Sequence, residues 1–93
     1  MTVFAKDPAS TVDYSFDWSG WLTSGELITS AIWSLDPTSA NAPALGTEIA
    51  VGSTRGIYVS GGTAGYRYRL ACKVETDAGR VAERSLTLRI MEV

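Results

Sequence analysis

The strongest constraint on the fold is a strict alternation of apolar and charged side chains in residues 66–76, "YRYRLACKVET". A period of two is that of a β-strand, whose successive side chains point to opposite faces of a sheet. We therefore expect a strand with one face in a core and the other in water, as in an antiparallel sheet. The inward set is Tyr66, Tyr68, Leu70, Cys72 and Val74, and the outward set is Arg67, Arg69, Ala71, Lys73 and Glu75.

A second alternating run follows after a short turn. Asp77, Ala78 and Gly79 separate the two runs, and glycine adopts the positive φ that a short hairpin loop requires. Residues 80–91 are therefore expected to return as the partner strand, with three aliphatic side chains facing inward. Arg84 also falls on the inward register. Either it lies at the open end of the sheet or a bulge shifts the register there.

Shorter runs of the same kind occupy the rest of the chain. Residues 11–22 alternate between aromatic or aliphatic and polar side chains, and residues 26–35 are rich in β-branched side chains between turn-forming segments. Trp33, in the second run, is expected at the centre of the core. Two more strands are expected around residues 47–51 and 56–59. Six or seven short strands without sustained helical periodicity predict an all-β, immunoglobulin-like antiparallel β-sandwich.

The length of 93 residues suits one domain. We expect an N-terminal arm at residues 1–12 and a single immunoglobulin-like domain at residues 13–93. A single cysteine cannot form an internal disulfide. Cys72 is therefore expected to be a small buried side chain on a strand.

The residues needed for catalysis and metal binding are scarce. Histidine is absent, which removes the commonest general base and the commonest metal ligand. Asp13 and Asp17 are four positions apart, about 13 Å along a strand, which is too far for the carboxylate pair of a retaining glycosidase. No D-x-D-x-D-G calcium loop is present. We expect no enzymatic activity, no catalytic residue, no cofactor and no metal site.

Charge and hydropathy argue against two classes of partner. The net charge is −2 and the eight Lys and Arg residues are spread along the chain, so no basic block is available to neutralise phosphates. No apolar run approaches the roughly 20 residues that span a bilayer, and the first ten residues lack the apolar segment of a signal peptide. We expect a protein of a soluble compartment that binds neither nucleic acid nor membrane.

Four side chains are candidates for partner binding. Trp18 and Trp21 are three positions apart, so on a strand they would point to opposite faces and one of them would be exposed. Trp21 and the outward-facing Tyr58 could together contact a sugar ring or a protein. Asp77, at the hairpin tip, and Arg84, near a strand end, complete the set.

Edge strands are a further class of candidate, because their unpaired backbone groups can accept a strand of another chain. The expected edges of the sandwich are the first strand, residues 13–18, and the last strand, residues 84–90.

Five short phrases, in this order, give the chain a resemblance to one protein family. They are K-D-P, D-Y-x-x-D-W, I-x-S-A-x-W, S-G-G-T-A-G and T-x-A-G-R-x-x-E-R-S. The chain resembles the phage fiber-tail adaptor protein family from about Lys6 to Ile90, with the poorest fit in the segment from Ser34 to Gly56. The resemblance implies a single immunoglobulin-like domain with a structural, non-catalytic role in the virion. It also implies contacts with phage tail and tail-fibre proteins, a location in the phage tail, and assembly in the cytoplasm of the host bacterium.

Two alternatives remain open. Immunoglobulin-like domains on virions can also bind host receptors or carbohydrates, which would give Trp21 and Tyr58 a direct role. The chain could instead be a tail-assembly helper that the finished virion does not retain. In the assembled particle the protein could also be an oligomer.

Overall fold

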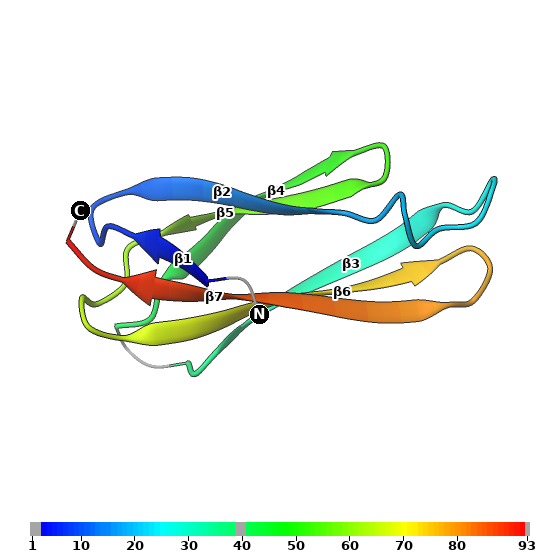
Figure 1. The fold of residues 1–93 in the computed structure, drawn as a ribbon. Coiled ribbons are helices and arrows are strands. Elements are labelled where there is room, and N and C mark those ends of the chain that lie inside the picture. Colours follow the sequence, from blue (N-terminus) through cyan, green and yellow to red (C-terminus); the bar gives the residue numbers. More distant parts are fainter. Residues whose placement is uncertain (1–2, 39–40, 93) are drawn as a thin grey trace.

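The computed structural model describes residues 3–38 and 41–92, and every regular element in them is a β-strand. Figure 1 shows two layers of strands that run along the length of the molecule. The expected all-β sandwich is confirmed. No helix in the described residues is long and apolar enough to cross a membrane. The strands are β1 (Val3–Lys6), β2 (Thr11–Asp17), β3 (Ile28–Asp36), β4 (Ala44–Val51), β5 (Thr54–Ser60), β6 (Arg67–Thr76) and β7 (Val81–Ile90).

The larger sheet has the strand order β1-β7-β6-β3, and the smaller sheet has the order β2-β5-β4. The predicted hairpin is β6–β7, which is antiparallel and in unbroken register from the pair Arg67 and Arg89 to the pair Glu75 and Val81. β1 pairs with the outer side of β7 in parallel. The prediction that the last strand forms an edge is therefore wrong, because β7 lies between β1 and β6. The first predicted strand, β2, does lie at an edge of its sheet.

The segment expected to be an N-terminal arm contributes to both sheets. β1 lies in the larger sheet and β2 begins in the smaller one at Thr11. Lys6, at the end of β1, is only 1% exposed, and its ammonium group donates to three backbone carbonyls. The acceptors are the carbonyl oxygens of Asp7 at 3.0 Å, Ser10 at 2.7 Å and Gly61 at 2.8 Å. The Lys6 side chain therefore bonds β1 to the turn before β2 and to Gly61, the residue after β5.

The core lies between the two sheets and has two parts. Trp33 is half-buried and packs against both of them, and its ring stacks on Phe16 with centroids 6.0 Å apart. Cys72 is a free, fully buried thiol, as expected. The buried residues of the larger part are Tyr14, Leu35, Ile57, Val59, Tyr68, Leu70, Leu86, Leu88 and Ile90, and those of the smaller part are Trp18, Cys72 and Val74.

Two predicted orientations in residues 66–76 are wrong, and the ambiguity at Arg84 is resolved. Tyr66, expected to face inward, is 59% exposed because β6 begins only at Arg67. Ala71, expected to face water, is buried although it lies on the outward register. Arg84 pairs with Cys72 within an unbroken register, so no bulge displaces it from the inward face.

Candidate functional site

Three segments gather at one end of the sandwich, which we call the loop end (Figure 1). The backbone N–H of Trp18 donates to the carbonyl oxygen of Ser53 at 3.0 Å, which joins the segment after β2 to the β4–β5 turn. The backbone N–H of Asp77 donates to the carbonyl oxygen of Leu27 at 3.0 Å, which joins the same segment to the β6–β7 turn. The loop end consists of residues 17–27, 51–54 and 76–81.

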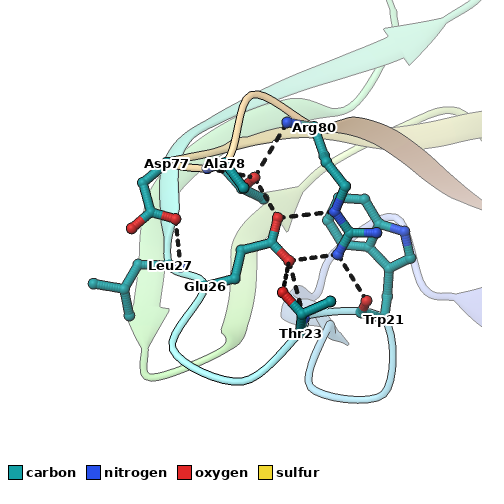
Figure 2. A network of polar contacts seen from close by, with 8 residues as sticks. Trp21, Thr23, Glu26, Leu27, Asp77, Ala78 and Arg80 are labelled. Atoms are coloured by element: carbon teal, nitrogen blue, oxygen red, sulfur yellow. Dashed lines mark hydrogen bonds and ion pairs between the residues drawn. The ribbon is translucent and has the colours of Figure 1, made fainter.

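The four expected partner-binding residues are not all in one place. Trp21 and Asp77 both belong to the loop end (Figure 2). Tyr58 lies in the middle of β5, opposite Asp13 of β2, and is partly exposed. Arg84 faces the space between the sheets. Its guanidinium nevertheless reaches the loop end, where it donates to the carbonyl oxygen of Asp17. The structure therefore brings Trp21, Asp77 and the end of the Arg84 side chain to the loop end and leaves Tyr58 apart from them.

A buried carboxylate holds the loop end together. Glu26 is only 7% exposed, and its two oxygens accept hydrogen bonds from Arg80, Thr76 and Thr23. The Nε of Arg80 donates to Oε2 at 2.9 Å, and its Nη2 pairs with Oε1. The hydroxyl of Thr76 donates to Oε2 at 2.5 Å, and the backbone N–H of Thr23 donates to Oε1 at 2.9 Å. The Nη2 of Arg80 also donates to the carbonyl oxygen of Trp21 at 2.9 Å. Figure 2 shows these bonds converging between the loop after β2 and the β6–β7 hairpin.

These hydrogen bonds fix the charge of the pair. Donation by Arg80, followed by that of Thr76 and Thr23, holds the pKa of Glu26 well below its usual value despite burial. Hydrogen bonding to Glu26 raises the pKa of Arg80. The carboxylate is therefore ionised at neutral pH and both its oxygens are occupied. Such a group serves to position the loop rather than to transfer protons.

Two arginine–tryptophan contacts extend the network into the core. The guanidinium of Arg80 lies 4.2 Å from the ring centroid of Trp21, and that of Arg84 lies 4.4 Å from the ring centroid of Trp18. The rings of Trp18 and Trp21 meet edge to face with centroids 5.6 Å apart. Arg84 also donates to the carbonyl oxygen of Asp17 at 2.8 Å. An inward-facing charge is accommodated here because it has an aromatic face and a backbone acceptor.

The hairpin tip is also bonded to the loop after β2. A carboxylate oxygen of Asp77 accepts from the backbone N–H of Leu27 at 3.0 Å, so two hydrogen bonds join these residues in opposite directions. Gly79 has φ of 78°, the positive value expected for this turn. The hydroxyl of Thr76 accepts from the backbone N–H of Ala78 at 3.3 Å, which adds a hydrogen bond within the turn.

Exposed aliphatic side chains surround this bonded framework. Leu27 is 65% exposed although both its backbone N–H and its carbonyl are bonded to Asp77. Val51, at the end of β4, and Val81, at the start of β7, are also large exposed apolar residues. The loop end thus combines a fixed backbone with apolar side chains that face water. That combination suits a protein contact more than a chemical reaction.

Over residues 3–38 and 41–92 the surface offers no pocket for a small molecule. The same residues contain no group of three or more acidic or cysteine side chains arranged to hold a metal ion.

Sequence reasoning missed the residues that organise the loop end. Glu26 and Arg80 are 54 positions apart, and nothing local marks them as partners. The phrase T-x-A-G-R contained a signal, since it places Arg80 directly after the turn at Gly79. The segment "TSGE" also contained one, since Thr23 and Glu26 have the three-residue spacing of a bonded turn.

Comparisons with known proteins support the fold and identify a family. Residues 6–89 match the family model described as podophage GP4 fiber-tail adaptor protein gp77. No curated protein matches the chain. Among solved structures, the solution structure of the PKD domain from KIAA 1837 protein has a TM-score of 0.58 and 16% sequence identity, and the match covers 98% of this chain and 79% of that one. The sandwich is therefore immunoglobulin-like, as the sequence predicts.

Proposed function

Because the chain belongs to the podophage GP4 fiber-tail adaptor family, we propose that it is a non-enzymatic connector in the phage tail. In this role it links tail and tail-fibre components through protein–protein contacts. The observation that carries the proposal is the family match, which extends over residues 6–89, nearly the whole chain. In this proposal the protein is assembled into the virion in the cytoplasm of the host bacterium and works there as part of the tail.

We assign one of the adaptor's contacts to the loop end. Its three segments are joined by backbone hydrogen bonds and by the buried pair of Glu26 and Arg80. A surface that is already ordered loses little conformational entropy when it binds, so more of the contact energy appears as affinity. Leu27 is the exposed large apolar side chain of the loop after β2, and Val81, just beyond the hairpin tip, is a second exposed apolar side chain.

The sugar-binding alternative has less support from the geometry. Arg80 already covers one face of the Trp21 ring. Tyr58 lies on a central part of β5, away from the loop after β2. A sugar ring that stacks on one of these side chains would therefore not contact the other.

The experiment measures binding of the purified protein to the tail and tail-fibre proteins encoded beside it, by biolayer interferometry. Leu27→Ser should weaken binding to one of them by about tenfold, the effect of removing a buried apolar anchor from an interface. Tyr66→Ser is the matched control, because Tyr66 is similarly exposed but precedes β6, at the opposite end of the sandwich from the β6–β7 turn. It should leave that affinity unchanged.

Two results would count against the proposal. Absence of binding to any tail or tail-fibre protein would remove the adaptor function. Equal affinities for wild type and Leu27→Ser, with Tyr66→Ser weakened instead, would move the contact to the opposite end. Circular dichroism spectra of both variants should match that of the wild type, since both side chains face water.

A further inference from the structure

The two sheets end in four edge strands, and they differ in how well they are protected against pairing with another chain. β1 has only four residues. β2 carries the exposed carboxylates of Asp13 and Asp17, and β4 carries Glu48 next to a break in its register after Leu45. Short length, charge and bulges are the usual means by which proteins protect sheet edges. Three of the four edges therefore have such protection.

β3 differs from the other edges. From Ile28 to Leu35 its sequence, "ITSAIWSL", contains no charged residue and no proline. The register with β6 is irregular only near its start, between Ile28 and Ser30, and is regular from Ser30 to Asp36. β3 is the last strand of its sheet, so one side of its backbone faces away from β6. This strand has the composition that favours addition of a further strand.

The central part of the outward face of β3, from Ser30 to Ser34, reads the same in both directions, whereas the exposed last residue of the strand, Asp36, has no matching charge at Ile28. Ser30, Ile32 and Ser34 alternate with the inward-facing side chains of the strand, and all three are exposed. Ile32 is at the centre of this face and is 61% exposed, although it is a large aliphatic residue on a sheet surface.

We propose that β3 pairs with β3 of a second copy of this chain, antiparallel and about a two-fold axis at Ile32. In that register each Ile32 faces Ile32 of the other copy, and each Ser30 faces a Ser34. A two-fold interface must be self-complementary, and a palindromic face satisfies that condition. The two four-stranded sheets would then form one continuous sheet across the dimer.

The same pairing would be unfavourable at β2. About its central residue, Ser15, an antiparallel pair of β2 strands would place Asp13 of one copy opposite Asp17 of the other. Like charges directly opposite each other destabilise a strand pair. β3 brings no charge into its central register, which is why the second copy is assigned to this edge.

The proposal concerns a different surface from the loop end and does not depend on the adaptor function. Sedimentation velocity of the purified protein between about 1 and about 200 µM should show a reversible monomer–dimer equilibrium, since one strand pair is a small interface. Ile32→Lys should give a monomer throughout this range. Val51→Lys is the matched control, because Val51 is a similarly exposed aliphatic residue at the end of β4 in the other sheet. It should dimerise as the wild type does.

A cross-linking experiment tests the register. Ile32→Cys should form a disulfide-linked dimer on mild oxidation, since opposite β-carbons in an antiparallel pair lie about 4.5–5.5 Å apart, and a small adjustment of the edge strands brings them to the roughly 4 Å that a disulfide spans. Ser30→Cys should not, because it faces Ser34 of the other copy. Cys72 is buried and does not compete.

A wild-type monomer at about 200 µM would overturn the proposal, as would a dimer that survives Ile32→Lys. Cross-linking through Ser30→Cys in place of Ile32→Cys would overturn the two-fold register. The variant Leu27→Ser, which should weaken binding to a tail protein, should leave dimerisation and cross-linking unchanged. The two proposals can therefore fail separately.

Discussion

Replacing Lys6 by methionine tests whether one buried ammonium group joins the N-terminal strand to the rest of the sandwich. The side chain is almost fully buried, and its Nζ donates to the carbonyl oxygens of Asp7, Ser10 and Gly61 at 2.7–3.0 Å. Methionine keeps a similar apolar stem but has no donor. The substitution therefore removes these hydrogen bonds while leaving most of the packing in place.

The magnitude follows from the three acceptors. A hydrogen bond to a charged group contributes about 1.5–3 kcal/mol to stability, so three independent bonds would give about 4.5–9 kcal/mol. Two effects reduce this sum. Burial disfavours the ammonium and lowers the pKa of Lys6, and carbonyls freed by the substitution can bind water instead. We expect the free energy of unfolding to fall by about 3 kcal/mol, which for a domain of this length lowers Tm by about 12–24 °C.

Urea titration followed by tryptophan fluorescence measures the change. Lys73→Met is the control, because Lys73 is exposed on β6 and its loss should change stability by no more than about 0.5 kcal/mol. Equal unfolding free energies for the Lys6 and Lys73 variants would refute the reasoning. The three carbonyl contacts would then not be what attaches β1 to the turn before β2.

Two further measurements address buried groups. Because the pKa of Glu26 is lowered in the fold, mainly by Arg80, its contribution to stability is present above its ordinary pKa of 4.5 and is lost as the pH falls below that value. Urea midpoints of the wild type should therefore fall more steeply than those of Glu26→Gln between about pH 5 and about pH 3, and parallel profiles would contradict this assignment. Burial, with a smaller effect of Glu48, raises the pKa of Cys72 to about 11. Its thiol should react with a disulfide reagent at about pH 8 only in concentrated urea, and rapid labelling of the native protein would show that the thiol is accessible.

The β6–β7 hairpin could be predicted because its signals are local. Alternation fixes which side chains face inward, and Gly79 marks the turn with a positive φ. Alternation also put Arg84 on the inward register but left a bulge there open, and the unbroken pairing with Cys72 excludes that bulge. Tyr66 was misplaced because alternation does not mark where a strand begins, and the residue precedes β6.

β1 could not be predicted from its own sequence. It has four residues and pairs in parallel with β7, which lies at the other end of the chain. Its pairing depends on a distant strand and on Lys6, a residue type that is seldom fully buried. Missing β1 also led to the wrong prediction that β7 forms an edge.

The candidate site was readable only in part. Asp77 was singled out as an acid at a hairpin tip, and Trp21 because a strand spacing from Trp18 would place the two rings on opposite faces. That spacing was wrong, because β2 ends at Asp17 and the rings of Trp18 and Trp21 meet edge to face. The Glu26–Arg80 pair that fixes the positions of Trp21 and Asp77 joins residues 54 apart, and single-sequence patterns do not report such pairs. Trp21 proved to be covered by Arg80, so the tryptophan contributes to order at the loop end rather than standing free.

The central claim is that this chain is a connector within the phage particle. Quantitative mass spectrometry of purified virions, from the phage or induced prophage that encodes it, tests this most directly by counting the chain against the major tail protein. A fixed copy number in intact particles is the result we predict. Absence of the chain from particles that contain complete tails would contradict the claim, and would favour an assembly helper that the virion does not retain.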